Sequence, residues 1–351
     1  MPSVFCDLNF IITAHQEPDA YKQHLQQLAG AGTVTFVLSP MHWAEAAEDA
    51  DPVRGTAKAD FMDSLLARWI CERRSLQRKE VTAAFFRFLR VQADPPQMIG
   101  SIVYVIADLT GVQAERNSRD FVAHLRAIRQ NHPLEQSLQQ ALDTNRVNGD
   151  RFRTGQLDAN FLRRIEKLYI ESLLPTQTPA GVVIDGDSKR RFLDGSQLTD
   201  FPAFAVESLA TYDSWRENRQ MNRNNFMDQQ HLIALPYVDF FLTDDAKLRA
   251  LVGRISPGLP FSIATLLTKS EFDLRYPMSL LPEFAAKWSS LGLKVEGERI
   301  RGCYGFLMEY DSRLWMWTHS HSPDKHEFFP ILNGYDEMKA VWLLTGQTST
   351  S

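Results

Sequence analysis

The sequence predicts an α/β protein built on a doubly wound parallel sheet. Two observations support this class. The short apolar runs at residues 34–38 and 240–242 lack polar alternation, which is typical of strands buried on both faces of a parallel sheet. Segments with helical spacing alternate with these runs, and such alternation favours right-handed parallel crossovers. We therefore expect a ligand crevice at the carboxyl ends of the strands.

Composition limits the class of protein further. A chain of 351 residues with 44% hydrophobic and 23% charged residues has enough apolar content for two or three folded units. The net charge of −5 provides no overall basic surface, so a nucleic-acid partner needs a local basic groove. The three cysteines lie far apart without a CxxC pair, which favours a reducing cytoplasm. No signal peptide or membrane span is visible, and the apolar run 98–109 is too short to cross a bilayer.

The first elements expected from the sequence carry two acidic residues that are candidates for a functional site. An apolar strand at residues 4–6 ends at Asp7, with Asn9 two residues later. A helix over residues 18–28 is followed by glycines, and a strand over 34–38 comes next. Ser39 and Pro40 have the residue types of a helix N-cap and first position, and the helix that they begin carries Glu45.

A second acidic group lies late in the chain, within residues 225–245. Asp228 falls near the first turn of an expected helix, whose packed face includes the apolar residues at 232, 233 and 235. The buried strand 240–242 follows and ends at Thr243, Asp244 and Asp245. We expect the acid on the helix and the acids at the strand end to share one crevice.

These pieces together resemble the PIN-domain nucleases, a family that includes VapC-type toxins. The family's Asp-x-Asn/Ser/Thr after the first strand is matched by Asp7 and Asn9, and its helical Glu by Glu45. Its late helical Asp is matched by Asp228, and its Thr-x-Asp by the motif ending at Asp245. The resemblance covers about residues 3–50 and 222–265, roughly a third of the chain.

The resemblance implies a metal-dependent endoribonuclease, with RNA favoured over DNA. Mg²⁺ or Mn²⁺ would be held by catalytic carboxylates, and a metal-activated water would attack phosphorus to leave a 5′-phosphate and a 3′-hydroxyl. The implied ligands are Asp7, Glu45, Asp228 and Asp245, with Asp244 an alternative or additional ligand, and the implied supporting residues are Asn9, Thr243 and His231. The competing interpretation is that His231 is a structural residue in the core or at the rim of the site. The biological setting, a toxin, a defence effector or RNA processing, stays open, as do an inhibitor protein and a homo-oligomer.

The remaining sequence indicates how the chain is divided into domains. Residues 1–50 and 220–275 form the expected nuclease core, 51–219 a helical insertion, and 276–351 a small α+β extension. Helices are expected over 57–89, 98–109, 118–129, 134–145, 158–174 and 202–218. The Pro- and Gly-rich segment 175–200 is expected to be a loop that contacts nucleic acid through Lys189, Arg190 and Arg191.

The C-terminal region has its own pattern. Residues 261–266 suggest a last strand of the core, 305–317 a β-hairpin, and 281–291 and 335–344 helices. The histidines at 319, 321 and 326 allow a zinc site as an alternative to exposed loop histidines.

Two other functions compete with the nuclease. The first is a catalytically silent PIN-like scaffold that binds RNA or a protein. The second is a phosphatase of the haloacid type, which needs Asp-x-Asp after the first strand, where this chain has Asn9.

Overall fold

The computed structural model describes residues 1–17, 19–110, 117–131, 134–217, 229–276, 305–310, 313–319 and 326–330. The chain divides into two compact units. The first comprises Met1–Pro18 and Leu25–Leu266, and the second Asp19–His24 and Leu267–Ser351. Asp228, the expected helices 281–291 and 335–344, and His321 lie outside the described residues.

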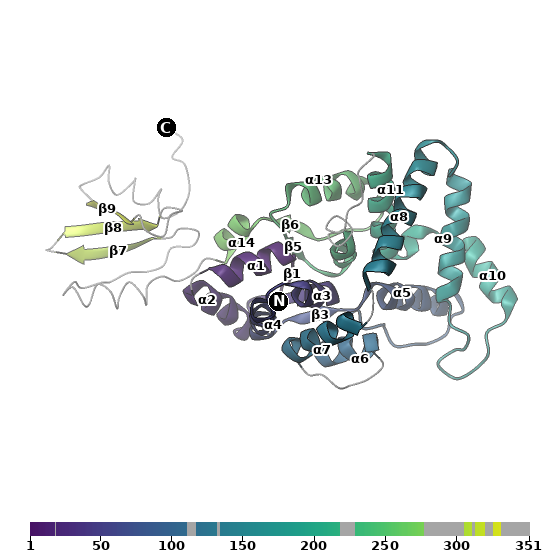
Figure 1. The fold of residues 1–351 in the computed structure, drawn as a ribbon, viewed down its shortest axis with the longest axis horizontal. Helices are drawn as coiled ribbons and strands as arrows, with labels where there is room; N and C mark the ends of the chain where they lie inside the picture. Colours follow the sequence, from purple (N-terminus) through teal and green to yellow (C-terminus); the bar gives the residue numbers. More distant parts are fainter. Residues whose placement is uncertain are drawn as a thin grey trace. The chain divides into compact units, whose positions relative to one another are not determined.

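The first unit is organised around a six-stranded sheet with the order β4-β3-β2-β1-β5-β6 (Figure 1). β1 pairs in parallel with β2 on one side and β5 on the other, β2 pairs in parallel with β3, and β4 runs antiparallel to β3. The strands are β1 (Ser3–Cys6), β2 (Thr35–Leu38), β3 (Arg68–Ile70), β4 (Ile99–Gly100), β5 (Phe240–Leu242) and β6 (Thr265–Leu267). The predicted α/β class with a mostly parallel sheet is confirmed.

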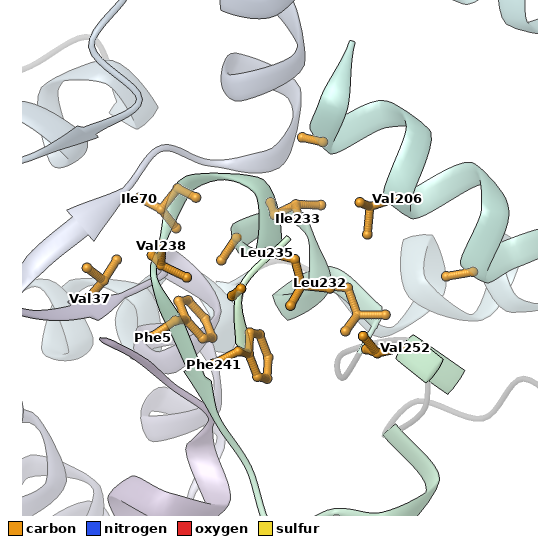
Figure 2. Close-up of a cluster of buried hydrophobic side chains, with 14 of the residues drawn as sticks. Phe5, Val37, Ile70, Val206, Leu232, Ile233, Leu235, Val238, Phe241 and Val252 are labelled. Carbon is orange, nitrogen blue, oxygen red and sulfur yellow. The ribbon is translucent and has the colours of Figure 1, made fainter. Parts of the chain in front are cut away.

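Both faces of the central strands are buried, as the continuous apolar runs predicted. On one face, Phe5 and Phe241 stack at 4.9 Å and join a cluster with Val37, Leu232 and Val252 (Figure 2). Side chains of the opposite parity, such as Val4 and Phe36, are also buried on the other face. Helices must therefore cover the sheet on both sides.

The helices connect and cover these strands. In the first half of the chain they are α1 (Leu8–Gln16), α2 (Asp19–Gly30), α3 (Pro40–Glu48), α4 (Pro52–Ser64), α5 (Arg73–Phe88), α6 (Ile102–Thr110) and α7 (Ser118–Asn131). Those that follow are α8 (Leu134–Arg153), α9 (Ala159–Leu173), α10 (Gly186–Gly195), α11 (Pro202–Arg216), α13 (Ala246–Ile255) and α14 (Lys269–Arg275). Short 3₁₀ segments are η1 (Leu198–Asp200), η2 (Leu232–Tyr237) and η3 (Ser256–Gly258).

The sequence led us to expect a helical region over 51–219, but the structure places two strands within it, β3 and β4. The predicted helix 57–89 is interrupted by β3, and the predicted helix 98–109 begins with the strand residues of β4. β3 joins the sheet because Trp69 packs on Trp43 of α3 with ring centroids 3.9 Å apart, while Ile70 enters the cluster on the opposite face. Successive side chains of a strand point to opposite faces and can therefore be buried on two sides, whereas successive side chains of a helix cannot.

The segment 175–200, expected to be a loop, contains α10. Asp185 caps this helix by accepting a hydrogen bond from Ser188 N–H at 2.6 Å, and Phe192 is buried against Phe85 of α5. Capping and one apolar anchor are sufficient to order a helix in a polar sequence. Lys189, Arg190 and Arg191 therefore lie on a helix and not on a flexible loop.

The start of α11 is capped by a residue from another helix. Glu80 of α5 is buried and accepts hydrogen bonds from Ala203 N–H at 2.6 Å, from Phe204 N–H at 3.4 Å and from the Tyr237 hydroxyl. Burial raises the pKa of Glu80 to about 7, against the opposing effect of these donors. A carboxylate at a helix N-terminus satisfies backbone donors that would otherwise be orphaned.

In the second unit the described residues include α14 and the antiparallel sheet β7-β8-β9. Its strands are β7 (Gly305–Tyr310), β8 (Arg313–His319) and β9 (His326–Pro330), so the predicted hairpin is confirmed and extended by a third strand. His319 and His326 are register partners at the end of the β8–β9 pair. Within the same unit, Tyr21 donates a hydrogen bond to Asp273 at 2.6 Å.

Candidate active site

The candidate site lies at the point where the winding of the sheet reverses. From β1 the chain proceeds outward through β2 and β3, whereas β5 and β6 occupy the opposite side of β1. The crevice outside the carboxyl ends of such neighbouring strands is where open α/β sheets bind ligands. Asp7 directly follows β1, and Thr243, Asp244 and Asp245 directly follow β5.

The sheet register brings these two strand ends together. Cys6 and Leu242 are paired, and Asp7 N–H donates to the Leu242 carbonyl at 3.0 Å. The Thr243 side chain is hydrogen-bonded to the Asp7 carboxylate. Two residues more than 230 positions apart in sequence, Asp7 and Thr243, thus lie side by side at the strand ends.

Asp7 is almost completely enclosed, with 4% of its surface exposed. It is the N-cap of α1 and accepts a hydrogen bond from Phe10 N–H at 2.7 Å. Burial raises the pKa of Asp7, while the bonds from Thr243 and Phe10 and the nearby His231 oppose the rise. The negative charge of Asp244 adds to the increase. An enclosed carboxylate near another acid is costly in the absence of a cation.

The two neighbouring aspartates have different surroundings. Asp245 is the N-cap of α13, where Oδ1 accepts Lys247 N–H at 2.7 Å and Leu248 N–H at 3.0 Å. Its own N–H donates to Thr243 Oγ1 at 3.1 Å. Asp244 is exposed and lies near enough to Asp7 to affect its pKa. The predicted ligand Asp245 therefore also serves as the cap of α13.

Glu45 approaches from α3, which begins as predicted at Pro40 with Ser39 as its N-cap. Glu45 Oε2 is buried and accepts no hydrogen bond within the described part of the chain, and it lies 3.7 Å from His231 Nε2. The carboxyl end of α3 is fixed by Arg126 of α7, which donates to the carbonyls of Ala46 at 2.9 Å and Ala47 at 3.1 Å. Cations at a helix C-terminus stabilise its unpaired carbonyls.

Two buried histidines connect α3 to the strand ends. The Ser39 N–H donates to His42 Nδ1 at 3.0 Å, so the His42 proton resides on Nε2, which donates to the Cys6 carbonyl at 2.8 Å. Burial, and then the neighbouring His231, lower the pKa of His42 to about 3. His42 is therefore neutral and fixes the backbone immediately before Asp7.

The Ser39 hydroxyl links the two imidazoles. Its Oγ lies 3.1 Å from His42 Nδ1 and 3.2 Å from His231 Nδ1. Because His42 Nδ1 already accepts the Ser39 N–H, the hydroxyl proton is directed to His231 Nδ1. His231 then carries its proton on Nε2, facing Glu45. The sequence pattern pointed to His231 but gave no signal for Ser39 as the bridge, because residues 39 and 231 meet only in the folded chain.

The other predicted residues are less central. Asn9 is exposed on the first turn of α1. On α10, Lys189 is partly exposed and Arg190 and Arg191 are exposed, with Arg191 donating to Ser188 Oγ at 3.3 Å. Within the described ranges, no group of three or more His, Cys, Asp and Glu side chains is arranged to hold a metal ion.

Comparison with known proteins does not assign the chain to a family. No family model, curated protein or solved structure matches the chain. Over the residues that the structure describes, no helix has both the length and the apolar content needed to cross a bilayer.

Proposed function

We propose that the chain is a metal-dependent nuclease of PIN type that hydrolyses phosphodiester bonds, with RNA favoured over DNA. The observation that carries the proposal is the position of Asp7 beside Thr243 and Asp244 at the reversal point of the sheet. Acids placed at this point by two adjacent strands lie where α/β folds bind ligands.

The chemistry of the donor set supports a hard divalent cation. Asp7 and Glu45 supply carboxylate oxygens, which Mg²⁺ and Mn²⁺ prefer. Glu45 Oε2 is a buried acceptor without a hydrogen bond among the described residues, and burial raises the pKa of Asp7. Both features correspond to carboxylates that gain stability when a cation binds. Asp228, with Asp244 or Asp245, would complete the ligand set.

When bound, the metal would neutralise the negative charge that develops on the phosphoryl oxygens during hydrolysis. The residues of the chain prepare the site for this charge. Thr243 and the Phe10 N–H orient Asp7, and His231 Nε2 lies 3.7 Å from Glu45 Oε2. Oriented ligands avoid the cost of reorganisation at the moment of reaction.

The test is cleavage of a mixed single-stranded RNA pool and of matched DNA, with Mn²⁺, with Mg²⁺ and with EDTA. The wild-type chain should cleave RNA only with metal, and Asp7→Asn should not cleave it. Asp187→Asn, which changes an exposed acid on α10, is the matched control and should cleave at the wild-type rate.

Two outcomes would contradict the proposal. Wild-type cleavage by the Asp7→Asn variant would exclude Asp7 as a catalytic ligand. Absence of cleavage on both polymers, combined with absence of Mn²⁺ binding in calorimetry, would favour the silent PIN-like scaffold. Mapped 5′-phosphate ends on the products would distinguish hydrolysis by metal chemistry from cleavage through the 2′-hydroxyl.

A further inference from the structure

Helix α9 presents large apolar side chains to solvent. Phe161, Ile165 and Leu168 have 38%, 46% and 65% of their surfaces exposed. Their spacing of four and three residues places them on one face of the helix. We call these residues the α9 stripe. Exposed apolar side chains that gather on one helix face mark interaction surfaces more often than scattered ones do.

The stripe is separate from the face that α9 uses within its own unit. Ile170 and Leu173 point to the opposite side, where they join the core cluster that α5, α10 and α11 also supply. α9 packs beside α5 and α10 in the fold (Figure 1). None of the candidate site residues lies on α9, so the stripe has no role in the proposed site.

The charges beside the stripe indicate its partner. Arg164 and Glu171, both exposed, lie seven residues apart on the same flank of the stripe. If a second α9 packs in the antiparallel direction, the Arg164 of each copy approaches the Glu171 of the other. In a parallel pair the same flanks of the two helices lie on opposite sides of the interface, so only the antiparallel arrangement brings Arg164 and Glu171 together. The flank is therefore complementary to itself under a twofold axis, the commonest symmetry of protein dimers.

We infer that the α9 stripe is a self-association surface, through which two copies of this chain form an antiparallel, twofold dimer. The aliphatic character of Ile165 and Leu168 suits helix packing better than base stacking, which prefers aromatic faces. One short helix stripe is small beside a standard interface, so the dimer should be weak, with a Kd of roughly micromolar order.

The experiment is sedimentation equilibrium of the full chain from about 1 to 200 μM, a span that brackets a micromolar Kd. The wild-type mass should rise from monomer towards dimer. Leu168→Glu should weaken dimerisation at least about tenfold, because it buries a charge next to the twofold axis, which the pairing of Arg164 with Glu171 places beside position 168. Val53→Glu, which changes an equally apolar side chain exposed on α4, is the control and should dimerise normally.

A charge exchange tests the antiparallel arrangement. Arg164→Glu alone should weaken dimerisation by about two- to thirtyfold, because the twofold dimer loses two exposed ion pairs. Arg164→Glu combined with Glu171→Arg should restore it. The inference is overturned if the wild-type chain stays monomeric throughout, if Leu168→Glu dimerises like the wild type, or if the double variant is as weak as the single one.

Discussion

Replacing Asp7 by Asn should make the protein more stable while abolishing cleavage. The Asn side chain keeps an oxygen that can accept the Phe10 N–H, and Asp and Asn are equally good N-caps. The substitution removes a charge whose burial, together with the nearby Asp244, is unfavourable enough to raise the pKa of Asp7. Functional sites commonly trade stability for activity in this way.

The size of the effect follows from comparison with Asp7→Ala. Alanine also removes the buried charge, but it leaves the Phe10 N–H without its acceptor, which costs about 1 kcal/mol. Asp7→Asn should therefore exceed Asp7→Ala in unfolding free energy by about 1 kcal/mol, or about 3 °C in Tm for a unit of this size. Both variants should lack metal-dependent cleavage.

The advantage of Asp7→Asn over the wild type should depend on pH. The folded wild type binds the Asp7 proton more tightly than the unfolded chain, because the pKa of Asp7 is raised above 3.8. The contribution of Asp7 to the unfolding free energy of the wild type therefore falls as pH rises from about 3.8 to the raised pKa. The gap between Asp7→Asn and the wild type should widen over the same interval and then stay constant.

Urea unfolding in EDTA at several pH values, followed by far-UV circular dichroism, measures these differences. Metal must be absent, because its binding would stabilise the wild type selectively. If Asp7→Asn is as destabilised as Asp7→Ala, the carboxylate makes a net favourable interaction and the argument from burial is wrong. If Asp7→Asn is stable but still cleaves RNA, the catalytic role is wrong and the structural reasoning stands.

Three further predictions follow from the contacts of individual residues. Asp245→Ala should cost about 1 kcal/mol of unfolding free energy through loss of the α13 cap, measured by urea unfolding. From pH 4.5 to 7 the unfolding free energy of the wild type should fall by about 3 kcal/mol relative to that of Glu80→Gln, since the pKa of Glu80 rises from 4.5 to about 7 on folding. In ¹⁵N NMR spectra, His231 should carry its proton on Nε2, and Ser39→Ala should increase the Nδ1-protonated form; an unchanged tautomer would refute the proposed bridge.

Local sequence was sufficient to predict the strands and the helix that carry most of the candidate site. Residues 4–6 and 240–242 are strands because their uninterrupted apolar side chains are buried on both faces, and Asp7 and Thr243 follow where each strand ends. Ser39 and Pro40 began α3 as expected, since their preferences for the N-cap and first position are local. Register and strand order then followed the rules for parallel sheets closely enough to bring the two strand ends together.

Tertiary structure decided the features that depend on distant partners. The apolar side chains in and around residues 68–70 are spaced as in a helix. The segment nevertheless forms β3, because Trp43 covers one face of this strand and the main core cluster covers the other. The basic segment at 189–191 is helical because Phe192 has an aromatic partner on α5. No local pattern could show these contacts, because each partner is supplied from more than 20 residues away.

The same distinction applies within the candidate site. The sequence by itself determined which acids follow the strands, because strand ends are set by local hydrophobic patterns. Only the folded chain decided that Asp245 caps α13 while Asp244 affects the pKa of Asp7, and that Ser39 joins His42 to His231. Side-chain hydrogen bonds require distances near 3 Å, and that precision arises only when the packed helices and strands fix every backbone position.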